Sequence, residues 1–205
     1  MLVVGHPTDT HPSCPPATDY VTRLREAFLA AVAADDGPRA DALGRTLDTA
    51  DRAPQSLSGA AQWYVARGWP VFPLTVGGKA PATSRGFLQA STDPDRVGAW
   101  WSAHPESNIG IPTGVRFDVI DVDYRTYPGA MHVWASIKDL FEAHGMVSTP
   151  RGVHVYTMPA GAQNGTGAGG VAGLDYRGRG GYVVVPPSVR PDGRYVWWSP
   201  PSPSI

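Results

Sequence analysis

Residues 117–123 (FDVIDVD) alternate apolar and acidic side chains in a pattern that could bind metal ions. The alternation predicts a strand, in which Asp121 and Asp123 project from the same face about 7 Å apart. Carboxylate oxygens at this spacing suit Mg²⁺ or Mn²⁺, which keep water and substrate phosphates as their other ligands. The alternative is that the strand ends here and both acids simply face solvent. Asp118 lies on the opposite face, where we expect a structural role.

Residues 149–156 (TPRGVHVY) place a histidine on a second predicted strand. His154 follows Arg151 by three residues, and the two side chains could meet a triphosphate. Gly152 lies between them and would let a ligand approach the backbone closely. The alternative is a strand histidine with an ordinary place in the core or on the surface.

Residues 173–182 (GLDYRGRGGY) combine one acid, two arginines and several glycines just before an apolar strand. Asp175 could supply a third carboxylate, while Arg177 and Arg179 could bind phosphates or a template. The alternative is a glycine-rich hairpin whose arginines only add solubility.

Residues 165–170 (GTGAGG) match the pattern G-x-G-x-x-G, which indicates dinucleotide binding only between a strand and a helix of a βαβ unit. A strand and a turn are predicted to follow here, so we exclude a dinucleotide site. The sequence also contains no Walker A motif, so this segment alone is not an ATPase.

The candidate residues need a sheet to position them, and the sequence predicts strands interspersed with helices. A helix is expected from Ser58, as its cap, to Gly68; a second opens at Thr92-Asp93-Pro94, and a third covers residues 128–144 and is closed by Gly145. Strands are expected at residues 69–74, 108–111, 116–123, 153–158, 181–185 and 194–198. This order favours an α/β or α+β sheet domain.

The composition changes along the chain and suggests three regions. Residues 1–56 are expected to form an N-terminal arm followed by a small helical region, and residues 57–198 the main domain. Residues 199–205 (SPPSPSI) have the composition of a linker, which suggests a longer protein.

Charge and hydropathy exclude several classes of protein. The net charge of −1 over 205 residues lacks the large basic excess of many nucleic-acid-binding proteins, although residues 151–205 hold five arginines against two aspartates. The sequence has no apolar run long enough to span a membrane and no secretory signal. Its single cysteine, Cys14, excludes a disulfide framework, so we expect a cytosolic protein.

Taken in order, the three motifs resemble the bifunctional primase–polymerase domain of plasmid and phage replication proteins, a branch of the archaeo-eukaryotic primase superfamily. The resemblance covers about residues 58–198. It also includes residues 66–74 (ARGWPVFPL), residues 78–81 (GKAP), Trp100-Trp101 and the run at residues 173–188.

The resemblance implies that Asp121, Asp123 and Asp175 bind metal and that His154 contacts the phosphates of the incoming nucleotide. It further implies an α/β core with an RRM-like sheet, and two-metal phosphoryl transfer with Mg²⁺ or Mn²⁺. We expect Asp121 and Asp123 to face solvent in the cleft.

Two arginines complete the expected nucleotide site. Arg177 lies in the Arg-Gly-x-Gly-Gly-Tyr run typical of the family, and a phosphate role for it is a hypothesis. Many relatives have a serine or a second glycine before the histidine, where this chain has the shorter Arg151-Gly152-Val153-His154. Arg151 could replace the missing donor, or the nucleotide contacts could be looser.

The expected function is primer synthesis and extension on single-stranded DNA from NTPs or dNTPs, in the cytoplasm of a bacterial host. A helicase module is expected in the same full-length chain. The alternatives are a non-catalytic module that binds single-stranded DNA or nucleotides, and a metal-dependent nuclease. Trp69, Trp100 and Trp101 could stack on template bases, although their amphipathic placement favours the core.

Overall fold

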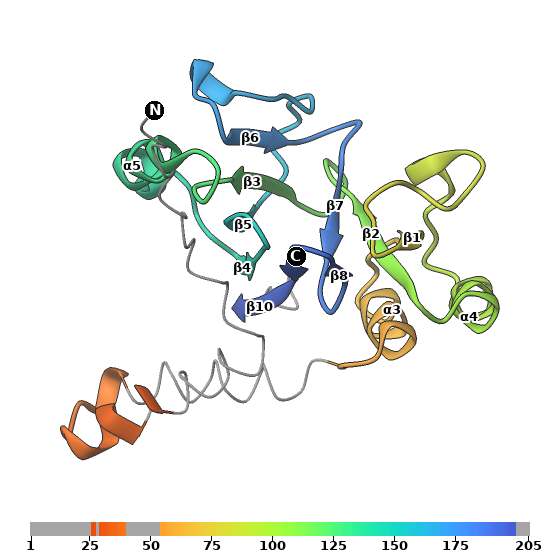
Figure 1. The fold of residues 1–205 in the computed structure, drawn as a ribbon, viewed down its shortest axis with the longest axis horizontal. Coiled ribbons are helices and arrows are strands. Elements are labelled where there is room, and N and C mark those ends of the chain that lie inside the picture. Colours follow the sequence, from red (N-terminus) through yellow and green to blue (C-terminus); the bar gives the residue numbers. More distant parts are fainter. Residues whose placement is uncertain (1–25, 28, 40–53, 200–205) are drawn as a thin grey trace, which may run out of the picture.

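Two antiparallel sheets dominate the structure, a computed structural model that describes residues 26–27, 29–39 and 54–199 (Figure 1). The smaller sheet has the order β1-β2-β7 and comprises β1 (Phe72–Val76), β2 (Ser107–Pro112) and β7 (Tyr182–Val185). The larger sheet has the order β10-β4-β5-β3-β6 and comprises β10 (Val196–Ser199), β4 (Gly145–Ser148), β5 (Val153–Thr157), β3 (Asp118–Val122) and β6 (Leu174–Arg177). A short hairpin of β8 (Val189–Arg190) and β9 (Gly193–Arg194) precedes β10.

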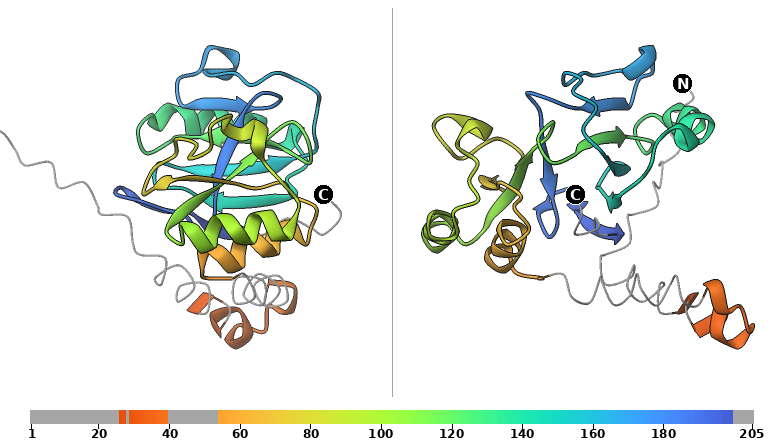
Figure 2. Two further views of the ribbon diagram at one scale, coloured as in Figure 1. Left: turned by 90° about the vertical axis from the view of Figure 1, so that its right-hand side faces the viewer. Right: turned by 180° about the vertical axis from the view of Figure 1, so that it is seen from behind.

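Three helices cover these sheets (Figures 1 and 2). Helices α3 (Leu57–Val65) and α4 (Pro94–Ala103) pack together and against the smaller sheet, whereas α5 (Pro128–Ile137) contacts β3 of the larger one. Asp93 caps α4 by accepting hydrogen bonds from the amides of Asp95 and Arg96, and Pro94 occupies its first turn, as the sequence predicts. The cap of α3 is Ser56 rather than the expected Ser58, since the Ser56 hydroxyl accepts from the Gly59 amide at 3.2 Å.

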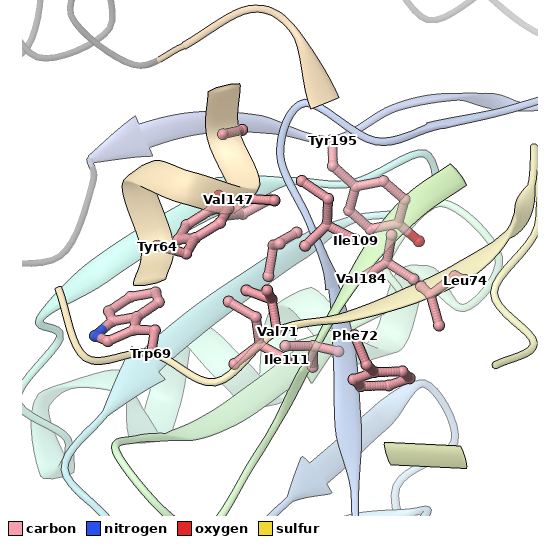
Figure 3. Packing of buried hydrophobic residues seen from close by; sticks show 14 of the residues in the cluster. Tyr64, Trp69, Val71, Phe72, Leu74, Ile109, Ile111, Val147, Val184 and Tyr195 are labelled. Carbon is pink, nitrogen blue, oxygen red and sulfur yellow. The ribbon is translucent and has the colours of Figure 1, made fainter. Parts of the chain in front are cut away.

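The larger of two hydrophobic clusters joins both sheets and α3. Figure 3 shows Tyr64 of α3, Ile109 of β2 and Val147 of β4 meeting in it. Trp69 lies at its aromatic centre, with its ring centroid 4.6 Å from that of Phe117. The second cluster lies beneath α5, on the opposite face of the larger sheet. One face of the larger sheet therefore meets the smaller sheet, and the other meets α5.

Mixed helices and antiparallel strands agree with the α+β alternative of the predicted class. The expected helix over residues 128–144 is wrong in its second half. It ends at Ile137, and the 3₁₀ helix η2 (Lys138–Leu140) turns the chain so that Phe141 packs on Trp134 at 6.0 Å. Gly145 does not close a helix but begins β4, where it pairs with Tyr156.

The expectations for the N-terminal region lie largely outside the described residues. Residues 26–27, 29–33 and 37–39 are helical. The expected arm at residues 1–16 lies outside the described residues, as do residues 200–205 of the linker expected at 199–205; Ser199 is the last residue of β10. The boundaries 1–56, 57–198 and 199–205 stay predictions. Within the described part of the chain, no helix is long and apolar enough to cross a membrane.

Candidate active site

Strand register brings three of the predicted site residues into one row. Asp121 of the central strand β3 lies opposite His154 of β5 on one side and opposite Asp175 of β6 on the other. Directly opposed residues of antiparallel strands have Cα atoms only about 5 Å apart and point to the same face. That face is the one toward the smaller sheet, because Val119, two residues before Asp121, belongs to the cluster that joins the sheets.

A pocket of about 260 Å³ opens beside this row. Residues of β3, β5 and β7 line it, together with the glycines before β7 and the turn between β4 and β5. Charged side chains of both signs line it: Lys79, Asp121, Asp123, Arg151, Arg177 and Arg190. Such a mixture suits a ligand that carries both phosphates and bound cations.

Arg177 forms ion pairs with two of the acids. Its Nη2 lies 2.7 Å from Asp175 Oδ2 and 3.2 Å from Asp121 Oδ2. The Asp121 side chain is only 13% exposed, so the expectation that it faces solvent is wrong. It lies in a partly buried, charge-compensated group instead.

Asp175 is held in place by the glycine-rich segment before it. The Gly167 amide donates to Asp175 Oδ1 at 2.8 Å, and Gly165 exchanges backbone hydrogen bonds with Tyr176 of β6. Gly167 adopts the left-handed conformation (φ 61°), which a glycine allows without strain. The G-x-G-x-x-G match is therefore a support for Asp175, and an antiparallel strand follows it, as the exclusion of a dinucleotide site requires.

Asp123 follows the last residue of β3 and also lines the pocket. Its amide donates to the Gly173 carbonyl at 2.7 Å, and its own carbonyl accepts from Tyr127 at 2.9 Å. Burial raises the pKa of its carboxyl group, and the neighbouring charges of Asp121 and Asp175 raise it further. Arg151 and Arg177 act in the opposite direction and lower this pKa, so Asp123 lies among charges of both signs.

His154 is buried and only 5% exposed. Its Nε2 lies 3.5 Å from Asp121 Oδ1, and its Nδ1 has no hydrogen-bond partner among the described residues. Burial lowers the pKa of His154 more than Asp121 raises it, so the ring is neutral at pH 7. A neutral imidazole can donate one hydrogen bond to a ligand and accept another.

Arg151 is presented by the tight turn between β4 and β5. The Thr149 hydroxyl accepts from the amides of Arg151 and Gly152 at 3.3 and 2.9 Å. A Cβ at Gly152 would lie 1.7 Å from the Val122 carbonyl oxygen, so only glycine fits there. The close approach is to a neighbouring strand rather than to a ligand, and it fixes the turn against the end of β3.

The three carboxylates have the chemistry of a site for a hard cation such as Mg²⁺ or Mn²⁺. Asp121 Oδ1 is buried without a hydrogen-bond partner in the described structure, and it is available as a ligand. Among residues 26–27, 29–39 and 54–199, however, no three His, Cys, Asp or Glu side chains are close enough to hold a metal as they stand. Arg177 instead pairs with two of the three acids, Asp121 and Asp175.

Other sequence candidates lie outside the pocket. Asp118 is fully buried and accepts hydrogen bonds from the Tyr176 hydroxyl and, at 2.7 Å, from the Ala160 amide, as its expected structural role requires. Trp69 and Trp101 are buried in the core, so neither can stack on a template. Trp100 is partly buried beneath the guanidinium of Arg96.

Sequence reasoning did not assign two cations of the pocket, Lys79 and Arg190. Lys79 follows β1 in a loop held by Asn108, which donates to the Gly78 carbonyl at 2.8 Å, and by Tyr182, which donates to the Lys79 carbonyl at 3.0 Å. Its signal was the GKAP segment among the family-like pieces. Arg190 had no comparable signal, since β8 is too short for a periodic pattern.

Comparison with known proteins identifies the family of the chain. Among curated proteins, none matches the chain. The family model described as bifunctional DNA primase/polymerase, N-terminal, matches residues 61–204, which include every residue of the row and the pocket. The chain belongs to the bifunctional DNA primase/polymerase family.

Proposed function

We propose that this domain synthesises and extends primers on single-stranded DNA by nucleotidyl transfer, with its active centre at Asp121, His154 and Asp175. Family membership indicates DNA primase or polymerase activity in general. The observation that carries the finer proposal is the register that places these three residues opposite one another, beside a pocket lined by four cationic side chains.

Asp121, Asp123 and Asp175 would hold the divalent cations, Mg²⁺ or Mn²⁺. Bound there, two cations would supply the positive charge that activates a primer 3′-hydroxyl and neutralises the departing pyrophosphate. The chain's own contribution is to place Asp121 and Asp175 on adjacent strands, and Asp123 just after β3, beside a pocket. For this, the Arg177 side chain would have to move away from Asp121 and Asp175. Its guanidinium would then bind the phosphates of a nucleotide in the pocket.

His154 and Arg151 would orient the incoming nucleotide. The neutral His154 can donate a hydrogen bond to a phosphate oxygen, and burial keeps competing water away from it. Arg151 reaches the pocket from the turn that Gly152 fixes, and its guanidinium can bind a phosphate with two parallel hydrogen bonds.

The wider context rests on the family resemblance. We propose that residues 57–198 form a catalytic core of the archaeo-eukaryotic primase type with an RRM-like sheet. The same proposal places the protein in phage or plasmid replication, in a bacterial cytoplasm. It also includes a helicase module in the same full-length chain.

One observation favours a second candidate function. Because Arg177 neutralises two of the three acids, the domain could bind nucleotides or single-stranded DNA without catalysis. A metal-dependent nuclease would use the same acids, but it would hydrolyse DNA instead of incorporating nucleotides.

Nucleotide incorporation on single-stranded DNA tests the proposal. The wild-type protein is incubated with Mg²⁺ or Mn²⁺ and NTPs or dNTPs, with and without an annealed primer, beside Asp121→Asn. The matched control is Asp139→Asn, which removes one exposed acid outside the pocket. Products from wild type and the control but not from Asp121→Asn support the proposal, and products without a primer identify a primase.

The opposing results are equally clear. Normal incorporation by Asp121→Asn would refute the assignment of the centre. Cation-dependent nucleotide binding by a folded wild type without any product would favour the binding module, and hydrolysis of DNA without incorporation would favour a nuclease.

A further inference from the structure

Two arginines from separate elements converge on one carboxylate at the edge of the pocket. Asp192 lies in the turn between β8 and β9. Its Oδ2 lies 3.5 Å from Arg151 Nε, and its Oδ1 lies 3.3 Å from Arg190 Nε. Arg151 comes from the turn between β4 and β5, so the contact joins segments that are far apart in the sequence.

Both arginines line the same pocket as His154. The Arg190 side chain is only 17% exposed and lies near the Tyr195 side chain, whose ring centroid lies 5.8 Å from that of His154. Arg190 is therefore a positioned, largely desolvated cation. Desolvation strengthens its attraction for an anion, because less water screens the charge.

The carboxylate, in contrast, is easily displaced. Asp192 is 38% exposed and belongs to a hairpin of only two paired residues on each strand. The ion pair of Asp192 with the half-exposed Arg151 contributes little to stability, since water competes for both side chains. A phosphate group presents more oxygens and more charge than one carboxylate, and guanidinium groups bind it with matching geometry.

We infer that Arg151 and Arg190 form an anion subsite for a phosphate group, and that Asp192 is its internal counterion, displaced when the phosphate binds. The inference rests on the proposed function only for the identity of the ligand that carries the phosphate. This ligand is either the incoming nucleotide or the DNA strand. It extends the nucleotide site beyond the residues predicted from the sequence, since Arg190 and Asp192 have no role in that prediction.

The critical variant is Asp192→Asn, because it should improve binding, and a misfolded protein cannot produce a gain. The probes are inorganic tripolyphosphate, dATP and a single-stranded oligonucleotide, each titrated at low salt in EDTA, so that binding does not depend on the metal ligands. Asp139→Asn is the charge-matched control, since Asp139 is exposed and lies outside the pocket.

Release of two partly exposed ion pairs should tighten tripolyphosphate binding by about three- to tenfold in Asp192→Asn. Arg190→Gln should weaken it by about tenfold or more, because a desolvated charge-assisted contact is lost. Arg194→Gln, an exposed arginine of the same hairpin outside the pocket, is the control and should weaken it far less.

The pattern over the probes identifies the source of the phosphate. Tighter binding of tripolyphosphate and dATP supports a nucleotide subsite, whereas tighter binding of the oligonucleotide alone supports a subsite for the DNA backbone. Equal affinities of Asp192→Asn and Asp139→Asn for all three probes would overturn the inference. These measurements contain no catalytic step, so failure of the proposed nucleotidyl transfer would appear only in the incorporation assay.

Discussion

Replacement of Arg177 by glutamine tests whether this side chain holds the acidic row together in the absence of a cation. Arg177 donates to Asp175 at 2.7 Å and to Asp121 at 3.2 Å, and its side chain is 25% exposed. Hydrogen bonds to charged groups contribute about 1.5–3 kcal/mol each when buried. Partial exposure and the shared donor atom reduce the sum, so we expect a loss of about 2–3 kcal/mol in the free energy of unfolding.

A loss of that size should lower the melting temperature by about 5–10 °C for a chain of this length. The measurement is thermal and urea unfolding in EDTA, with Arg194→Gln as the control for a lost surface charge. Mn²⁺ should then stabilise Arg177→Gln more than wild type, because the cation no longer competes with a guanidinium for the two carboxylates. At a free concentration of 100 times its dissociation constant, a bound cation adds about 2.7 kcal/mol.

Two results would refute this reasoning. If Arg177→Gln were as stable in EDTA as the Arg194→Gln control, the ion pairs would contribute nothing. If Mn²⁺ stabilised wild type and Arg177→Gln equally, Arg177 would not compete with the cation. Mn²⁺ would then bind at a site other than Asp121 and Asp175, or not at all.

Three further predictions concern the packing around the site. Gly152→Ala should lower the free energy of unfolding by about 2 kcal/mol or more, or prevent folding, because its Cβ would meet a β3 carbonyl. The control Gly165→Ala, with no atom within 4 Å of the added Cβ, should be nearly neutral in urea unfolding, and equal effects of the two variants would contradict this prediction. Tyr156→Phe removes a buried hydroxyl without a hydrogen-bond partner in the described structure and should leave the free energy of unfolding unchanged or higher. Tyr64→Phe loses two buried hydrogen bonds and should lower it by about 1–2 kcal/mol, so a larger loss for Tyr156→Phe would refute this prediction. Because burial lowers the pKa of His154 in the folded protein, the unfolded chain binds the proton first as the pH falls below about 6.5. Wild type should therefore lose stability between pH 6.5 and 5 more steeply than His154→Gln. Parallel profiles of stability against pH would exclude that linkage.

Local signals in the sequence were enough for several elements. Asp93 and Pro94 define the start of α4 because a cap and a fixed φ act within one turn of helix. The alternation of apolar and acidic residues around Asp121 predicted β3. It also placed the side chains of Asp121 and Asp118 on opposite faces, since side chains alternate between the two faces of a strand.

Local signals were not enough where distant segments compete for the same residues. Gly145 has the type of a helix terminator, yet pairing with β5 makes it the first residue of a strand. Asp175 and Arg177 read as part of a glycine-rich turn, and only the pairing of β6 with β3 makes them strand residues beside Asp121.

The sequence by itself determined which residues could do the chemistry: three acids, a histidine and arginines in the order typical of the family. The tertiary structure alone decided how they meet. Register across β5, β3 and β6 sets Asp121 opposite His154 and Asp175. Two ion pairs, Arg177 with Asp121 and Arg151 with Asp192, join side chains from separate strands and turns. These two long-range pairs have no fixed spacing in the sequence. They form only in the folded chain, where a buried charge without a partner would cost free energy.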